Sequence, residues 1–213
     1  MTFVPRHRRQ AAVVLLALTG SLAMAGCQLN GPIATEPTSQ GSTVSTSEFS
    51  TLDAAGVDRI RTGRTARLDM SSGTLQKADV RVTADSYGPE IKVKDGGKIA
   101  LTIVGPAGEI EGETDRIRFN TTDARADFSE VTYFLTTGSM DGYVSLIHEG
   151  VDKYGISSEV AERWIDSMGK RPRDKSDFAL DPGTSTGLSV TYDLRYDGAK
   201  DTQVIIVHVA PAS

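Results

Sequence analysis

The sequence predicts an α+β fold, in which an antiparallel β-sheet has two consecutive helices packed on one face. Residues 65–136 and 187–209 contain segments in which every second residue is apolar, the pattern of half-buried strands. Between them, over residues 141–169, the apolar residues recur at helical spacing instead. Residues 51–213 are enough for a single domain with its own hydrophobic core.

The first strands are identified by alternation and by the turns that separate them. Four segments with this pattern are residues 65–70, 79–84, 116–120 and 129–136. Residues 90–105 have the pattern of a β-hairpin, because the turn sequence Asp95-Gly96-Gly97-Lys98 separates two alternating runs. We therefore expect these strands to follow one another in an antiparallel sheet.

Two helices are expected next. Apolar residues at helical spacing predict a first helix over residues 141–155, which ends at Gly155, a residue suited to the left-handed C-terminal position. Ser157 is suited to cap a second helix, whose apolar face includes Trp164 and which ends at Gly169. This pair of adjacent helices supplies the layer that covers the sheet.

A second hairpin is predicted at the C-terminal end. Residues 187–196 alternate strictly between apolar and polar, and Asp197-Gly198 supplies a turn. Residues 202–209 carry apolar side chains at both odd and even positions. A strand of that kind is buried on both faces, so we expect it at the centre of the sheet.

The N-terminus has the features of an export signal. Three arginines precede an uncharged apolar run, Ala11–Gly26, which is shorter than a transmembrane span. The run ends in Ala25 and Gly26, followed by Cys27, the only cysteine of the chain. This stretch resembles the lipobox of bacterial lipoproteins, with Met24 where leucine is usual. Without this resemblance, a cleaved secretory peptide or an N-terminal membrane anchor would explain the pattern.

The resemblance implies a processed and acylated protein. Residues 1–26 would be a signal peptide, cut between Gly26 and Cys27, and Cys27 would carry a diacylglyceryl group that holds the protein on the extracytoplasmic face of the cell membrane. Cleavage removes three arginines and no acids, which takes the formal net charge from −5 to −8. An acidic exported chain of this kind is not expected to bind nucleic acid.

Residues 27–50 are expected to form a tether between the lipidated cysteine and the domain. They are rich in Ser, Thr, Pro and Gly, contain no Lys or Arg, and show no sustained apolar period. Such a segment buries too little apolar surface to offset the entropy of ordering it. We therefore expect residues 51–213 to form the single folded domain.

One short motif points to an enzyme. Residues 183–187, Gly-Thr-Ser-Thr-Gly, fit the G-x-S-x-G pattern of serine hydrolases, and His208 follows downstream. A nucleophile of that type sits on a strand-to-helix turn, whereas Ser185 follows the turn Asp181-Pro182-Gly183 and leads into a predicted strand. We therefore interpret the motif as a loop and keep a surface hydrolase that uses Ser185 and His208 as an alternative.

An acidic segment is a candidate cation site. Carboxylates occupy alternate positions at Glu109, Glu111, Glu113 and Asp115. In an extended chain they point to one side, where they could bind a hard cation or simply keep an edge strand from pairing. His148 has Glu149 and Asp152 nearby, which supplies at most two ligands on one helical face, so no metal site and no cofactor are expected.

A basic segment follows the second predicted helix. It consists of Lys170, Arg171, Arg173 and Lys175. These side chains favour the helix C-terminus, and they could also contact phosphate-rich polymers or lipid head groups.

The sequence thus favours a non-catalytic binding or accessory module attached to the membrane through diacylglyceryl-Cys27. Its partner would be an envelope protein, a glycan or a lipid. A carrier for an apolar envelope molecule and the surface hydrolase are the alternatives.

Overall fold

The computed structural model describes residues 49–94, 96–121 and 124–213. The predicted signal peptide, its cleavage site, Cys27 and the tether up to residue 48 lie outside the described residues. Phe49 and Ser50, which we expected in the tether, already contact the folded domain. The ring of Phe49 lies 5.6 Å from the guanidinium carbon of Arg67, and the main-chain N–H of Ser50 donates to the main-chain oxygen of Arg67.

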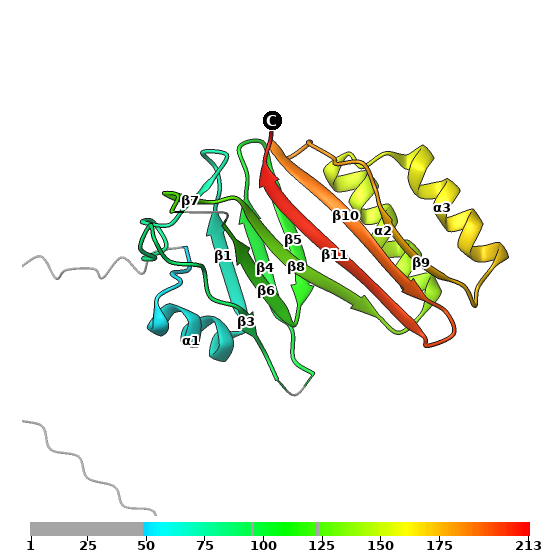
Figure 1. Cartoon of the computed structure of the whole chain (residues 1–213), viewed down its shortest axis with the longest axis horizontal. Helices are drawn as coiled ribbons and strands as arrows, with labels where there is room; N and C mark the ends of the chain where they lie inside the picture. The colour runs from blue at the N-terminus through cyan, green and yellow to red at the C-terminus, as the bar shows by residue number, and fades with distance from the viewer. Residues whose placement is uncertain (1–48, 95, 122–123) are drawn as a thin grey trace, which may run out of the picture. The chain divides into compact units, whose positions relative to one another are not determined.

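A six-stranded sheet, in which every pair of neighbours is antiparallel, forms the larger layer (Figure 1). Its strands, in spatial order, are β3 (Ile91–Lys92), β6 (Arg116–Asn120), β8 (Glu130–Thr137), β11 (Thr202–Pro211), β10 (Leu188–Asp197) and β9 (Lys175–Ala179). The long hairpin β10–β11 places the last strand of the chain between β8 and β10, so β11 is central as predicted. The expected burial on both faces is wrong, because alternate residues of β11 are only partly buried. The strict alternation of buried side chains on β10 also agrees with the prediction.

A smaller sheet contains β1 (Thr65–Asp69), β4 (Ile99–Val104) and β5 (Glu109–Thr114). β1 pairs with β4 in parallel, and β4 pairs with β5 antiparallel, which leaves β5 at an edge. The strand over residues 65–69 therefore forms, but not in the single antiparallel sheet that we expected. β2 (Leu75–Gln76) and β7 (Asp127–Phe128) form a separate two-stranded ladder.

Three helices begin at capped N-termini. α1 (Ala54–Gly63), α2 (Met140–Tyr154) and α3 (Ser158–Lys170) are capped by the side chains of Asp53, Ser139 and Ser157. Gly155 ends α2 in the left-handed conformation, with φ of 75°, as the sequence predicted. Within the described ranges, none of these helices has both the length and the apolar character that a membrane span requires.

The same face of the six-stranded sheet packs against both α2 and the smaller sheet. Gly150 of α2 lies against the ring of Tyr192 on β10, and Gly112 of β5 lies against the ring of Tyr133 on β8. Trp164 of α3 continues this layer through ring contacts to Tyr143 and Tyr196. Most side chains on the opposite face of the sheet are only partly buried. The fold is therefore the predicted α+β arrangement with consecutive helices packed on a sheet.

Two strand predictions are wrong, and they fail for different reasons. Residues 79–84 form turns, because Lys77 is buried and its ammonium donates to the main-chain oxygen of Ala84 at 2.8 Å. Residues 90–105 do not form a hairpin, because β3 pairs with β6 whereas β4 pairs with β1 and β5. In the first case alternation did not even indicate an extended segment, and in the second it did not identify the partner strands.

Two helical glycines give a matched test of this packing. A methyl group at Gly150 would lie 2.6 Å from Cε2 of Tyr192, whereas a methyl group at Gly169 on α3 would meet nothing within 4 Å. We expect Gly150→Ala to lower the free energy of unfolding by about 1–3 kcal/mol through overpacking. Gly169→Ala should raise it, by up to about 1 kcal/mol, through helix propensity. Urea unfolding of both variants checks this, and equal effects would contradict the packing described.

Candidate functional site

A groove of about 430 Å³ lies between the free edge of β5 and helix α2. We call it the central groove. Its apolar lining comes from Leu101, Leu135, Leu146 and Tyr192, which belong to β4, β8, α2 and β10. Its charged lining comes from Lys98, Glu111, Glu113, Glu149 and Lys153. The groove exists because two separate layers cover one face of the larger sheet and leave a gap between them.

A tyrosine joins the two sides of the central groove through Glu111, one of its lining residues. The hydroxyl of Tyr154, at the last position of α2, accepts a hydrogen bond from the main-chain N–H of Glu111 at 3.2 Å. It donates to the main-chain oxygen of the same residue at 3.0 Å. Tyr154 thus satisfies the edge of β5 at one residue, as a neighbouring strand would, and fixes the distance between β5 and α2.

Glu113 offers free polar groups to the central groove. Alternate residues of an edge strand direct their main-chain groups away from the neighbouring strand, and Glu111 is one of these because it bonds to Tyr154. Glu113, two residues further, therefore also directs its N–H and C=O away from β4 and towards the groove. Among the described residues, its carboxylate has neither an ion pair nor a hydrogen-bond partner.

Lysines lie at both ends of the central groove. Lys153 contacts Glu149 at 2.6 Å and Glu111 at 3.8 Å. The hydrogen bond to Glu149 is the main cause that raises the pKa of Lys153, so its ammonium stays charged. Lys98, at the other end, donates to the hydroxyl of Thr136. The groove therefore presents both charges above an apolar floor.

The buried tyrosines beside the groove are neutral. Burial raises the pKa of Tyr133 and of Tyr192 well above the usual value of 10.0. The hydroxyl of Tyr133 is buried and has no hydrogen-bond partner among the described residues. Tyr192 lines the groove, whereas Tyr133 lies behind it under Gly112 of β5.

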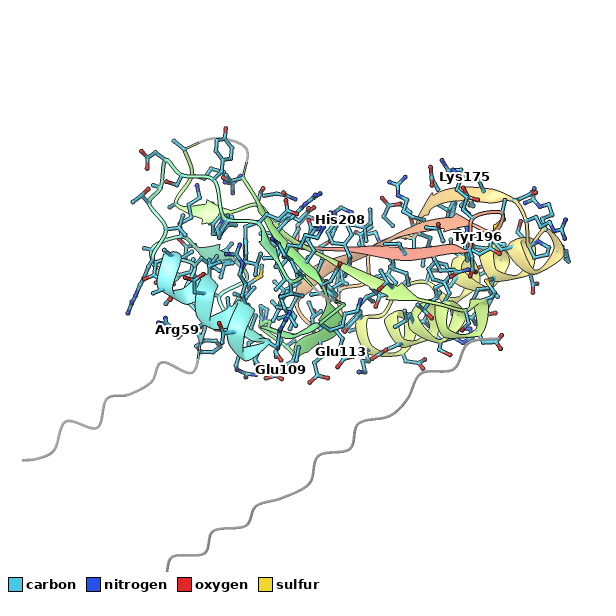
Figure 2. All side chains as sticks on the ribbon, turned by 90° about the horizontal axis from the view of Figure 1, so that it is seen from below. Arg59, Glu109, Glu113, Lys175, Tyr196 and His208 are labelled. Carbon is cyan, nitrogen blue, oxygen red and sulfur yellow. The ribbon has the colours of Figure 1, made fainter. Side chains whose placement is uncertain are left out.

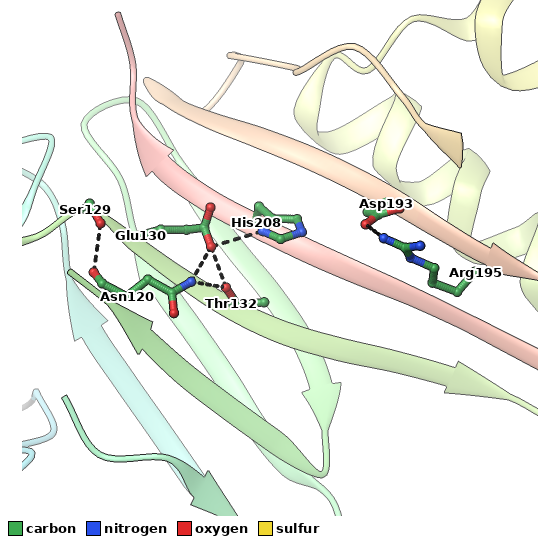
Figure 3. Close-up of polar contacts among 7 residues, drawn as sticks. All are labelled: Asn120, Ser129, Glu130, Thr132, Asp193, Arg195 and His208. Atoms are coloured by element: carbon green, nitrogen blue, oxygen red, sulfur yellow. Dashed lines mark hydrogen bonds and ion pairs between the residues drawn. The ribbon is translucent and has the colours of Figure 1, made fainter. Parts of the chain in front are cut away.

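A second polar cluster lies on the opposite face of the larger sheet (Figure 3). His208 contacts the carboxylate of Glu130 at 3.0 Å, and that carboxylate also accepts from Thr132 at 2.6 Å and from Asn120. Burial alone raises the pKa of Glu130, but the hydrogen bonds from His208, Thr132 and Asn120 outweigh it, and the net pKa is lowered. The hydrogen bond to Glu130 raises the pKa of His208. The cluster joins β8 to β11 through the His208–Glu130 pair and β6 to β8 through the hydrogen bond from Asn120.

Ser185 and His208 are not brought together. Ser185 lies in the turn before β10, and its N–H donates to the main-chain oxygen of Tyr154 at 3.2 Å, on the α2 side of the sheet. His208 pairs in register with Thr191, whose side chain points to the face opposite Tyr192 and α2. The turn at Ser185 leads into a strand, so it lacks the strand-to-helix geometry of a nucleophile elbow.

The acidic segment forms the exposed side of edge strand β5. Glu109 and Glu113 lie on the same side of the strand, as Figure 2 shows, with Glu111 between them. Glu109 pairs with Arg67 at 2.7 Å, and Glu111 is near Lys153, whereas Asp115 follows the strand. No group of three or more His, Cys, Asp or Glu side chains in the part of the chain described could hold a metal ion, so the geometry gives the cation hypothesis no support.

His148 links the two long helices. Its Nε2 contacts the carboxylate of Glu162 on α3 at 2.8 Å, rather than an acid of its own helix. The contact joins two exposed side chains and leaves His148 as a surface residue of the helix pair.

The basic segment lies where α3 ends and β9 begins. Arg171 donates to Ser167 at 2.6 Å and contacts Asp174 at 3.5 Å, and Lys175 contacts Asp177 at 3.8 Å. Lys170 and Arg173 are exposed and have no acidic partner in the described part of the chain. The segment therefore keeps free positive charge next to an edge strand.

Sequence reasoning did not find the central groove. Its residues come from five parts of the chain, and none of them stands in a local motif. Only the alternation of Glu111 and Glu113 on an expected edge strand was visible in advance. Comparisons with protein-family models, with curated proteins and with solved structures find no match for the chain.

The His208–Glu130 pair predicts a pH dependence of stability. A raised pKa for His208 means that its charged form stabilises the folded state below the unfolded value of 6.5, and that this contribution is lost as pH rises through the folded value. The lowered pKa of Glu130 contributes above its unfolded value of 4.5. The pair is therefore most stabilising in mildly acidic solution, between these two values.

His208→Gln tests this expectation. We expect the variant to lose about 1 kcal/mol of unfolding free energy near pH 5.5 and clearly less near pH 8.5. Urea unfolding at both pH values gives the difference. His148→Gln, which removes a more exposed histidine, serves as the matched control and should keep most of the wild-type slope. A loss that does not depend on pH would show that the pair is not ionised.

Proposed function

We propose that the chain is a lipid-anchored protein of the cell envelope, held at the extracytoplasmic face of the membrane by a diacylglyceryl group on Cys27. The support is in the sequence: three arginines, the uncharged run Ala11–Gly26, two small residues and the only cysteine stand in that order. Two acyl chains anchor a protein stably, whereas one chain binds only marginally.

The folded domain, in this proposal, is a non-catalytic binding module whose ligand occupies the central groove. The observation that carries this proposal is the position of Glu113, whose free main-chain groups and unpaired carboxylate border a groove with an apolar floor. Polar groups of that kind fix the orientation of a ligand, while apolar contacts supply most of its affinity.

The lining favours a compact ligand with both polar and apolar parts. Lys98 suits an anionic group and Glu113 a cationic or hydrogen-bond-donating group, whereas Leu135 and Leu146 suit a short apolar portion. A carrier for a purely apolar molecule has less support, because five charged residues line a groove of only about 430 Å³. The hydrolase has none from geometry, because Ser185 and His208 lie on different faces of the sheet.

A pair of tryptophan substitutions on α2 tests the binding site. Leu146→Trp places an indole in the central groove, whereas Ser145→Trp places one at the neighbouring exposed position. We expect wild-type protein and Ser145→Trp, purified from the envelope of the native host, to retain the same small molecule in native mass spectrometry. Leu146→Trp should retain less than about a tenth of it, a loss of roughly 1.4 kcal/mol in binding.

The same mass spectra also test the proposal that the protein is anchored through Cys27. The expected protein begins at Cys27 and carries the mass of a diacylglyceryl group. An uncut leader or an unmodified thiol would contradict the anchoring proposal alone. Equal retention of ligand by Leu146→Trp and Ser145→Trp would contradict the groove proposal alone.

A further inference from the structure

The strand β9 ends the larger sheet with a free edge. The N–H of Leu180 donates to the main-chain oxygen of Tyr192, and the N–H of Gly198 donates to the main-chain oxygen of Asp174. In an antiparallel pair these bonds occur at alternate residues, so Ser176 and Phe178 also face β10. The main-chain groups of Asp177 and Ala179 consequently face away from the sheet. No strand in the described part of the chain pairs with them.

A second groove lies beside this edge, under α3. It has a volume of about 350 Å³, and we call it the β9 groove. Val160, Trp164, Met168 and Phe178 supply its apolar lining. Phe178 is 39% exposed, which is unusual for a large hydrophobic side chain in this domain. The indole N–H of Trp164 donates to the hydroxyl of Ser176 at 3.0 Å and holds α3 over β9.

Positive charge borders the β9 groove, although the chain as a whole is acidic, with a net charge of −5. Arg163 and Arg171 line it, and Lys170 lines an adjoining hollow with both arginines and Asp166. Arg171 is partly compensated by Asp174 at 3.5 Å. Arg163 contacts only the exposed Glu159, a pair of little strength, and Lys170 has no acidic partner in the described residues. Figure 2 shows Lys175 close to the start of β9 at the same end of the domain.

We propose that β9 and α3 form a docking surface for an extended, acidic peptide segment of a partner protein, which adds to β9 as a further strand. The main chain of Asp177 and Ala179 supplies hydrogen bonds, the β9 groove takes an apolar side chain of the peptide, and Arg163, Arg171 and Lys170 attract its carboxylates.

Other occupants fit less well. A second copy that paired through its own β9, antiparallel and centred on Asp177, would place two Asp177 carboxylates opposite each other, which is unfavourable. A lipid phosphate would use the basic side chains but not the free main chain or the exposed Phe178. An acidic peptide uses all three features.

Trp164 makes the proposal directly measurable, because it is the only tryptophan of the chain and lines the β9 groove. The probe is a capped six-residue peptide with valine, glutamate and valine at positions 1, 3 and 5 and threonine between them, so that valine and glutamate both lie on the face under α3. We expect a saturable change in tryptophan emission, accompanied by shifts of the Asp177 and Ala179 amide resonances. The same peptide with every main-chain amide N-methylated should bind at least about tenfold more weakly, because it lacks strand-pairing donors.

Charge-reversal variants test whether the peptide binds at this surface or is attracted to the protein nonspecifically. The double variant Arg163→Glu and Lys170→Glu should weaken peptide binding at least about tenfold. Lys92→Glu reverses an exposed charge on β3, at the other edge of the same sheet, and should leave binding unchanged. Equal weakening by both changes would show nonspecific attraction and overturn the proposal.

Two further probes identify a different occupant. Inorganic polyphosphate and vesicles that contain phosphatidylglycerol are expected to produce no shift of the Asp177 and Ala179 amides. If either probe produces these shifts and displaces the peptide, the surface is an anion site and the proposal fails. Absence of any saturable change with the peptide, or equal binding of the N-methylated peptide, would likewise overturn it.

Discussion

One tyrosine hydroxyl holds two separate layers at a fixed distance above the same sheet, and the central groove depends on it. The larger sheet is covered on one face by α2 and by the smaller sheet, which do not pair with each other through main-chain ladders. Tyr154 spans the gap because its hydroxyl bonds both main-chain groups of Glu111. Beyond that contact, β5 and α2 leave Glu113 unpaired beside an apolar floor, which is the feature that supports a ligand site.

The parts of the fold that local pattern could predict are those in which one face of a segment is buried. The alternation of β10 and the capped helices around Gly155 and Ser157 follow directly from residue spacing and end signals. Pairing across long stretches of chain is not encoded in this way, so the partners of β3 and β4 were assigned wrongly. The short helix α1 was also missed, because only Val57 and Ile60 mark its apolar side.

The candidate sites show the same limit. The acidic and basic segments were visible in the sequence as charge patterns, but their neighbours were not. Glu113 lines the central groove because it lies on an edge strand. Lys170 belongs to the proposed docking surface because it lies near the exposed Phe178 of β9. Ser185 shows the opposite case, in which the sequence motif is present but the site is not. The turn lacks the strand-to-helix geometry of a nucleophile, and no histidine lies beside the serine.

Amide hydrogen exchange at two glutamates of β5 tests the central claim most directly. If Tyr154 bridges β5 and α2, the Glu111 amide is protected by the tyrosine hydroxyl, whereas the Glu113 amide, which faces the groove, exchanges much faster. In Tyr154→Phe the two amides should exchange at similar rates. Equal exchange of Glu111 and Glu113 in the wild-type protein would show that the bridge does not persist in solution, and the account of the groove would be wrong.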